Sequence, residues 1–356
     1  MSKTKEPEIE TAIAANGHTP ATMKQVVYTG QGGPEVLQVV ETDIPEPEPG
    51  EVRVKVLAAG VAFADLMIRH GTYPYPPPVG TPLGYDIVGL VDKSGPGISS
   101  LARGQMVGAL LAHHGGYTQY AIVPAEMVVP VPDGVDPAEA VCLILNYLTA
   151  YDMLHRLAKV KAGERLLIHS AAGGVGTAVL QLGKLAGLEM YGTASKGKLD
   201  LVAGLGATPI DYRRQDFAAR LRELTPEGIE VVLDPIGGPI LSRSYSLLRK
   251  GGRLITYGSL SLRSGGRLAY LPTLARFAWR KLIPDGKRIM FHTGLPQRAE
   301  RNKAWYRETL ARLFNWLAGG KLQPVVGKRL PLIKAAEAHT LLENGAVPGK
   351  IVLVRK

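Results

Sequence analysis

The stretch RLLIHSAAGGVGTAVLQLGKLAG, residues 165–187, decides the fold. It begins with a short apolar run and continues through a loop in which Ala171, Gly173 and Gly176 have the spacing of the motif G-x-G-x-x-G. Small residues are needed there because the turn from strand to helix is tight and a pyrophosphate approaches the backbone at the helix N-terminus. The segment after the loop predicts a helix, with apolar side chains at Val175, Ala178, Val179, Leu182, Leu185 and Ala186. The stretch therefore predicts a dinucleotide-binding strand–loop–helix unit.

On the C-terminal side of this stretch, strand-like runs alternate with helical runs. LEMYGTA, TPID, IEVVLD and GRLITYG predict strands, and KLDLVAGLG, DFAARLREL and ILSRSYSLL predict helices. Alternation at this spacing requires right-handed crossovers and a parallel sheet. We therefore predict a doubly wound, Rossmann-type domain over residues 147–290, within an α/β fold.

The segments on either side of that domain have a different pattern. KQVVYTG, VLQVVETDI and EVRVKVLAAGV are short β-branched runs bounded by Gly and Pro, which predicts a β-rich domain over residues 23–146. Two amphipathic helices and the strand GKIVLVRK close the chain, and we expect residues 291–356 to return to this first domain. Residues 1–22 are polar and are predicted to be a disordered tail.

The choice of dinucleotide depends on the residues about twenty positions after the glycine-rich loop. An NAD enzyme carries Asp or Glu there, whereas this chain has Ser195, Lys196 and Lys198 and no carboxylate. A hydroxyl and two ammonium groups suit the extra phosphate of NADPH, and Tyr212 could close the same pocket. Surface lysines near a loop are the alternative. The pattern favours NADPH as the cofactor.

Composition bounds the remaining possibilities. The formal net charge is +11, and residues 261–290 carry seven basic and one acidic residue. This segment suggests a solvated helix that covers the rest of the protein, a lid over a cleft, or a basic surface for a membrane or an acidic partner. No recognised nucleic-acid-binding module accompanies this charge. The single cysteine, Cys142, excludes an intrachain disulfide and suggests a reducing compartment. We expect a cytoplasmic protein, with peripheral membrane association through residues 261–290 as the alternative.

Several motifs resemble a known family. The segments AGV, ADLMIRHG, NYLTAY, AAGGVG and IDY resemble the medium-chain dehydrogenase/reductase superfamily, specifically its zinc-independent quinone oxidoreductase branch. DPIGG, YSLLRKGGRLITYGSL and FHTG resemble more particularly the vesicle amine transport protein subgroup. The similarity runs from Met23 to the C-terminus. It implies that residues 23–146 and 291–356 form a GroES-like catalytic domain.

The zinc enzymes of this superfamily carry a cysteine and a histidine at two positions that differ here. This chain has Ala62 at the cysteine position and Tyr85 at the histidine position, and one cysteine cannot build a four-cysteine lobe. A catalytic zinc needs three protein ligands and an open position. We therefore predict no metal. Relatives in the quinone branch usually have Asn where Ala62 stands, so a polar contact near the nicotinamide is missing.

The resemblance implies roles for individual residues. Tyr73 matches the tyrosine that mitochondrial enoyl reductases use as a proton donor, although it could instead only pack the pocket. The resemblance places substrate-pocket residues at Ala62, Phe63, Asp65, Arg69, Tyr85, Asn146 and His292, with Asp65 and Arg69 expected to form a structural pair. It places cofactor-binding residues, besides the loop Ala171 to Gly176 and the set Ser195, Lys196, Lys198 and Tyr212, at Asn146, Thr149, Gly174, Val175, Tyr257, Gly258, Ser259, Phe291, His292, Thr293 and Lys350.

These features together predict an NADPH-dependent reductase of α,β-unsaturated carbonyls or quinones. Two alternatives stay open: an enoyl-thioester reductase, and a membrane- or lipid-associated protein that binds NADPH and turns over slowly. Relatives commonly pair edge to edge, and GRLITYGS is a candidate edge strand, so a homodimer is expected.

Overall fold

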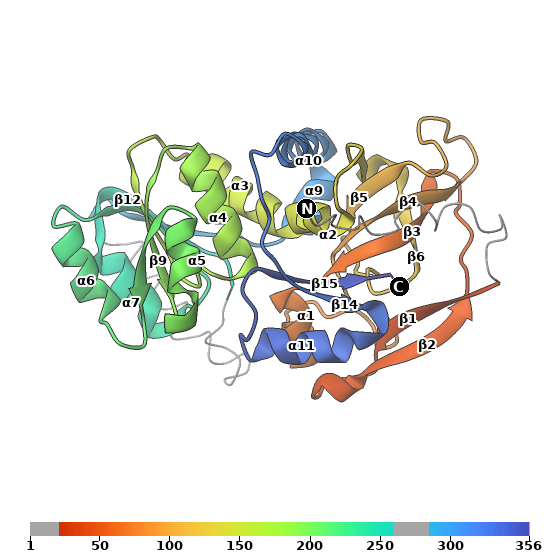
Figure 1. Ribbon diagram of the computed structural model, residues 1–356, viewed down its shortest axis with the longest axis horizontal. Coiled ribbons are helices and arrows are strands. Elements are labelled where there is room, and N and C mark those ends of the chain that lie inside the picture. Colours follow the sequence, from red (N-terminus) through yellow and green to blue (C-terminus); the bar gives the residue numbers. More distant parts are fainter. Residues whose placement is uncertain (1–20, 259–284, 356) are drawn as a thin grey trace, which may run out of the picture.

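The chain folds around two sheets that lie at opposite ends of an elongated molecule (Figure 1). The structure, a computed structural model, describes residues 21–258 and 285–355. Most of the predicted tail and of the basic segment 261–290 therefore lies outside the described residues, as does Ser259. Helices α2, α3 and α4 lie between the two sheets in Figure 1.

The first sheet has six strands in the order β10-β9-β8-β11-β12-β13, and every neighbouring pair is parallel. Its strands are β8 (Arg165–Ile168), β9 (Glu189–Ala194), β10 (Ala207–Asp211), β11 (Ile229–Asp234), β12 (Leu248–Thr256) and β13 (Arg288–Phe291). The crossover helices are α4 (Gly174–Leu185), α5 (Leu199–Gly204), α6 (Phe217–Leu224) and α7 (Gly238–Ser246), with the short turn η6 (Lys196–Lys198) before α5. The predicted Rossmann-type alternation is confirmed.

The second sheet has seven strands and is mainly antiparallel, in the order β14-β15-β3-β4-β5-β7, with β6 paired to β3. Its strands are β3 (Glu51–Gly60), β4 (Asp86–Ser94), β5 (Met106–Leu110), β6 (Tyr120–Pro124), β7 (Val128–Pro130), β14 (Val326–Pro331) and β15 (Lys350–Val354). A separate hairpin is formed by β1 (Thr22–Tyr28) and β2 (Leu37–Asp43). Since β15 pairs with β3, the end of the chain returns to the N-terminal sheet, as predicted.

Helices complete the molecule. Those around the second sheet are α1 (Phe63–Arg69), α9 (Leu295–Arg301), α10 (Lys303–Ala318) and α11 (Ala335–Glu343), with short turns at η2 (Pro34–Val36), η3 (Ala125–Met127) and η9 (Leu332–Lys334). A continuous helical segment leads from this sheet to the parallel one through α2 (Pro137–Cys142), η4 (Leu143–Tyr147), α3 (Leu148–Tyr151) and η5 (Asp152–Ala158). The segments η4 and η5 are wound as π-helix, which is rare and occurs frequently at functional sites.

Two details differ from the sequence prediction. The run GRLITYGS is not an edge strand, because β12 lies between β11 and β13, and β13 forms that edge of the sheet. Leu185, expected to face the core, is 48% exposed, because it is the last residue of α4 and the sheet no longer covers it.

A buried histidine lies at the carboxyl end of strand β8. His169 lies directly after β8, with its Nδ1 3.0 Å from Thr193 Oγ1 and its Nε2 2.8 Å from Ser244 Oγ. The ring is almost completely inaccessible to solvent, and this burial lowers the pKa of His169 to about 3. The two hydroxyls satisfy a neutral ring, so the fold stabilises the uncharged form.

This burial predicts a pH dependence of stability. Between about pH 6.5, the ordinary value for histidine, and pH 3, the unfolded chain binds one more proton at this position than the folded protein. The free energy of unfolding therefore falls as pH falls, by about 1.4 kcal/mol per pH unit from this group. In His169→Gln, the free energy of unfolding, measured by urea denaturation at several pH values between 6 and 4, should change less with pH. The difference from wild type should be about 1.4 kcal/mol per pH unit. His113→Gln, at an exposed ring, is the control, and equal slopes in wild type and His169→Gln would contradict the prediction.

Candidate active site

The predicted cofactor residues gather at one edge of the parallel sheet. All six strands run in the same direction, so their carboxyl ends lie together, and open α/β sheets bind ligands at this edge. The predicted residues that follow these ends are Ala171 to Gly176 after β8, Ser195 to Lys198 after β9, Tyr212 after β10, Tyr257 and Gly258 after β12, and His292 and Thr293 after β13. The sheet therefore brings together segments that are far apart in the sequence.

The glycine-rich loop is as tight as its sequence predicts. Ser170 opens the turn with a positive φ of 56°, and α4 begins at Gly174. A Cβ on Gly176 would lie 2.3 Å from the carbonyl oxygen of Ser170, so a side chain there would force the helix away from the strand. The close packing leaves the first amide groups of the twelve-residue α4 at the sheet edge, where they can bind an anion.

Asn146 lies against this loop. A Cβ on Gly174 would lie 2.2 Å from Asn146 Nδ2, so the asparagine needs a glycine opposite it. Asn146 belongs to the π-helical segment η4, and its side chain is largely buried. Thr149, one turn further along in α3, is also buried. The structure thus places the NYLTAY segment beside the helix N-terminus.

The C-terminal strand joins the same place. The amide of Gly349 donates to the carbonyl oxygen of Ala172 at 2.8 Å, and the next residue, Lys350, forms an ion pair with Asp86 at 2.7 Å. Both charged side chains are almost completely buried. A Cβ on Gly60 would lie 2.1 Å from Lys350 Cε, so the pair also needs this glycine. The ion pair holds the start of β4 beside the glycine-rich loop.

Tyr85, which directly precedes Asp86, forms a cluster with two other rings. Its hydroxyl donates a hydrogen bond to the Tyr73 hydroxyl at 2.7 Å. The ring of His114 lies 4.2 Å from that of Tyr85 and 6.4 Å from that of Tyr73, measured between centroids. Burial raises the pKa of Tyr85 and lowers that of His114 to about 4. At neutral pH Tyr85 is therefore a protonated donor, and Tyr73 keeps its own hydrogen for another acceptor.

His292 is held by an ionic cluster at the end of β13. Its Nε2 lies 2.9 Å from Asp152 Oδ2, and the same carboxylate accepts bonds from Arg156 and Arg298. Burial alone would raise the pKa of Asp152, but the bonds and charges of these three partners hold it well below its usual range. Asp152 stays ionised and fixes the imidazole of His292. Its neighbours Phe291 and Thr293 are exposed.

The residues predicted to bind the adenosine phosphate of the cofactor differ in what they contact. Ser195 and Lys196 follow β9, and Lys196 is exposed. Lys198 is tied down instead: its ammonium donates to the carbonyl oxygens of Gly345 and Val347, and burial lowers its pKa. Tyr212 is half exposed. Lys198 therefore anchors the loop that leads to Gly349 and Lys350.

The predicted pair between Asp65 and Arg69 is wrong. Asp65 accepts bonds from the amides of Ala62 and Gly84 and from the Tyr117 hydroxyl, and burial raises its pKa to about 6. Arg69 donates to Gly32 and Glu343. Both side chains are fully buried, because each satisfies groups from a different loop around α1. They hold the helix that precedes Tyr73, whereas Phe63 on the same helix is partly exposed.

Metal ligands do not gather anywhere in residues 21–258 and 285–355. No group of three or more His, Cys, Asp or Glu side chains in these residues could hold a metal ion. Ala62 and Tyr85 stand at the positions where zinc relatives have ligands. Both are buried, and neither a methyl group nor a protonated phenol is a usual zinc ligand. Within the same described parts of the chain, no helix is long and apolar enough to cross a membrane.

Three residues of the site escaped sequence reasoning. His114 lies beside another histidine, Asp152 carries no motif, and Asp86 follows Tyr85 without a signal of its own. The signal that could have found Asp152 is Arg156 four residues later, an ordinary helical ion-pair spacing. No local pattern indicates that His114 stacks on Tyr85.

The parallel sheet, its glycine-rich edge and the antiparallel sheet that returns to it define the architecture of two-domain dinucleotide-dependent oxidoreductases. Family models agree: residues 48–133 match the alcohol dehydrogenase GroES-like domain, and residues 205–353 match the zinc-binding dehydrogenase model. The chain belongs to the medium-chain dehydrogenase/reductase superfamily and, within it, to the group that contains the VAT-1 homologs. The resemblance inferred from the motifs is confirmed.

Individual relatives support this placement. The chain is 30% identical to the human synaptic vesicle membrane protein VAT-1 homolog over 344 residues, which cover 93% of this chain and 86% of that protein. The crystal structure of the human VAT-1 homolog-like protein matches with a TM-score of 0.80 and 27% identity, covering 95% of this chain and 99% of that one. Escherichia coli quinone oxidoreductase complexed with NADPH matches with a TM-score of 0.81 and 29% identity, covering 94% and 100%.

Proposed function

We propose that the protein is a zinc-independent, NADPH-dependent reductase of α,β-unsaturated carbonyl compounds or quinones. The observation that carries the proposal is the hydrogen bond from Tyr85 to Tyr73, with Tyr85 at the position where zinc relatives have a histidine. The similarity to a quinone oxidoreductase complexed with NADPH supports it.

The residues present fit a bound NADPH. The loop from Ala171 to Gly176 leaves no room for side chains where a pyrophosphate approaches, and α4 directs its free amides there. No carboxylate follows β9, so Ser195, Lys196 and Tyr212 can take the additional phosphate. We assign the nicotinamide end to Asn146, Thr149, Tyr257, Gly258 and the segment from Phe291 to Thr293.

The chemistry follows from what the tyrosines can donate. When bound, NADPH would supply a hydride to the β carbon of the substrate, and negative charge would then develop on the carbonyl oxygen. Tyr73 has a free O–H to donate to that oxygen or to the α carbon, because its own oxygen already accepts from Tyr85. The same bond from Tyr85 stabilises the Tyr73 phenolate that forms when the proton leaves. No metal is needed to polarise the carbonyl.

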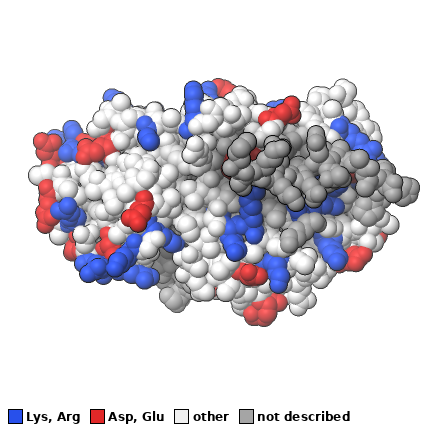
Figure 2. All heavy atoms as spheres, viewed as in Figure 1, with Lys and Arg blue, Asp and Glu red and all other residues white. Residues whose placement is uncertain are grey.

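The face of the molecule drawn in Figure 2 does not favour a nucleic-acid substrate. On the face drawn in Figure 2, Lys and Arg side chains are interspersed with Asp and Glu, and one group of basic side chains lies over α7. The described residues on this face form no continuous basic stripe of the kind that follows a phosphate backbone. A homodimer, the residue limits of the two domains and a cytoplasmic location stay predictions.

The direct test is the initial rate of NADPH and NADH oxidation by the purified protein against a panel of enones, enals and quinones, with a zinc chelator present. We expect turnover that prefers NADPH and that the chelator leaves unchanged. Turnover that the chelator abolishes would overturn the zinc-independent mechanism. Cofactor binding with no turnover, except on enoyl thioesters, would shift the substrate class to thioesters.

The proposed preference for NADPH predicts how reversing the charge of Lys196 changes the KM for each cofactor. Lys196→Glu should raise the KM for NADPH by about 5- to 30-fold, the factor for roughly 1–2 kcal/mol of attraction replaced by repulsion between exposed charges. The KM for NADH should stay within about twofold. Lys184→Glu, at an exposed lysine near the C-terminal end of α4, is the matched control. An equal change for both cofactors in Lys196→Glu would place the phosphate elsewhere.

A further inference from the structure

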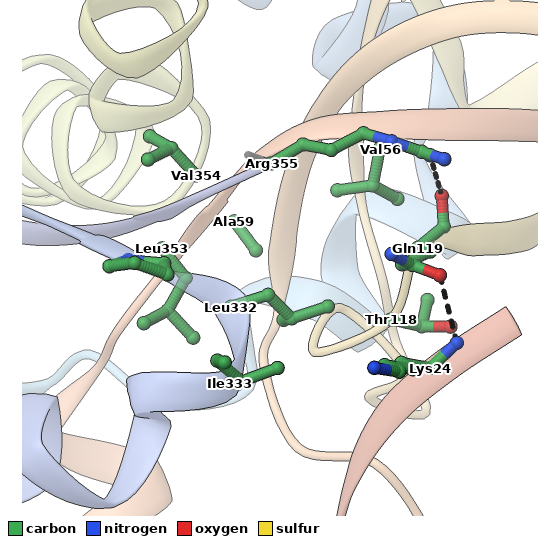
Figure 3. Close-up of a pocket in the computed structure, with 11 residues that line it drawn as sticks. Lys24, Val56, Ala59, Thr118, Gln119, Leu332, Ile333, Leu353, Val354 and Arg355 are labelled. Atoms are coloured by element: carbon green, nitrogen blue, oxygen red, sulfur yellow. Dashed lines mark hydrogen bonds between the residues drawn. The ribbon is translucent and has the colours of Figure 1, made fainter. Parts of the chain in front are cut away.

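A second pocket lies in the antiparallel half of the molecule, away from the glycine-rich loop (Figure 3). Its volume is about 400 Å³, within the range of small-molecule sites. Strands β3 and β15, the turn η9 and the N-terminal strand β1 enclose it, so it is assembled from both ends of the chain. No residue of the candidate active site lines it.

One side of the pocket is apolar. Val56 and Ala59 from β3 and Leu353 from β15 form a buried surface, and Leu332 and Ile333 of η9 extend it outward. Ile333 is 52% exposed, although it is a large apolar side chain. Covering such surface with another apolar group would gain free energy in proportion to the area removed from water.

The other side of the pocket is cationic. Gln119 lies between Lys24 and the guanidinium of Arg355 in Figure 3: its side chain accepts from the Lys24 amide at 2.8 Å and its carbonyl oxygen accepts from Arg355 at 3.1 Å. Arg355 also lies over the ring of Tyr120, 5.0 Å from its centroid. These contacts fix the guanidinium of Arg355 and the backbone of Lys24 before any ligand arrives, which lowers the entropic cost of binding at the arginine.

The ammonium of Lys24 has no hydrogen bond or ion pair with a described residue. The nearest acidic residue across the hairpin is Glu41, whose carboxylate accepts from the Thr22 hydroxyl. Among the described residues that line the pocket, no side chain is acidic. The lining of the pocket thus offers two cations and an apolar wall, and Glu41, directly opposite Lys24 in the strand register, stands outside this lining.

We propose that this pocket is a second ligand site, for a small amphipathic monoanion: an aliphatic or aromatic body against Leu332, Ile333 and Leu353, with its carboxylate at the ammonium of Lys24. The site is separate from the proposed reaction. Strand β15 begins at Lys350, beside the glycine-rich loop, and reaches the pocket three to five residues later, about 10–17 Å further along the strand. Ligand and cofactor should therefore bind at the same time.

The test is titration calorimetry of the full chain with decanoate, in the presence of saturating NADPH. We expect one saturable site per chain, no detectable binding of decanol, which lacks the charge, and no competition with NADPH. Lys24→Ala should weaken the binding of decanoate at least fivefold, and Ile333→Glu should abolish it. Both residues are exposed, so neither variant should change the melting temperature. Lys334→Ala, an exposed lysine next to Ile333 that does not line the pocket, is the matched control and should bind within twofold of wild type.

Three results would overturn the proposal: no saturable binding, equal affinity for decanol, or affinity unchanged in both Lys24→Ala and Ile333→Glu. Competition between decanoate and NADPH would also overturn it, because it would place the anion in the candidate active site. None of these results depends on turnover, so failure of this proposal and failure of the proposed reductase function are distinguishable.

Discussion

Replacing Tyr73 with phenylalanine is expected to lower kcat for enone or quinone reduction by about 10²- to 10⁴-fold, the usual contribution of a positioned proton donor. The ring and its packing are kept, and only the hydroxyl that accepts from Tyr85 and donates to the substrate is lost. The dissociation constant for NADPH should stay within about twofold, because Tyr73 has no place in the proposed cofactor site. Initial rates and a fluorescence titration with NADPH measure the two quantities separately.

Tyr75 provides the matched control for this experiment. It lies two residues away and is 85% exposed, so Tyr75→Phe should keep full activity. Tyr85→Phe should lower kcat by a smaller factor than Tyr73→Phe, because it removes a bond to the donor and leaves the donor in place. If Tyr73→Phe retained kcat within about threefold, the proton would come from water or another residue, and the tyrosine would only pack the cleft.

Asp86→Leu should destabilise the protein by about 3–5 kcal/mol, because it leaves the Lys350 ammonium buried without its partner. Leucine is larger than aspartate and leaves no cavity, so the loss reports the uncompensated charge together with some overpacking. Burial raises the pKa of Asp86 even though Lys350 opposes this, which indicates that desolvation of the pair is costly. Urea unfolding at pH 7 measures the change.

The double variant Asp86→Leu with Lys350→Met tests whether the lost stability comes from the unpaired charge. With both charges removed, most of the lost stability should return, since a buried pair and an apolar pair of similar volume are often nearly equal. Glu337→Ala, which removes one partner of the exposed pair with Lys334 at 4.0 Å, should change stability by less than about 1 kcal/mol. Additive losses in the double variant would show that the two side chains contribute separately.

Sequence reasoning was strongest where a pattern is local. The strand, loop and helix around Ala171 to Gly176 follow from small residues between two apolar runs, and the structure confirms them. The alternation through β12 is confirmed for the same reason. Sequence reasoning was weaker at the ends of elements. Leu185 fits the helical period, yet it lies in the last turn of α4 and is largely exposed.

Pairing between distant segments was the main source of error. Strand β13 has four residues, RIMF, too short to produce a period, and it displaced β12 from the predicted edge. Asp65 and Arg69 lie four residues apart on one helix and suggested a pair, but each found partners elsewhere, Tyr117 for one and Glu343 for the other. A side chain on a helix has many neighbours that only the fold supplies.

The sequence by itself determined the parallel sheet, the glycine-rich loop at its edge and the return of the chain to its first sheet, since periodicity and the steric needs of a tight turn act over a few residues. Only the tertiary structure decided which charges meet and which rings touch. The ion pair of Lys350 with Asp86, the anchoring of His292 by Asp152 and the stacking of His114 on Tyr85 join residues 264, 140 and 29 positions apart. Their partners are fixed by burial, because each charged or polar group taken from water must find a complement wherever the fold brings one.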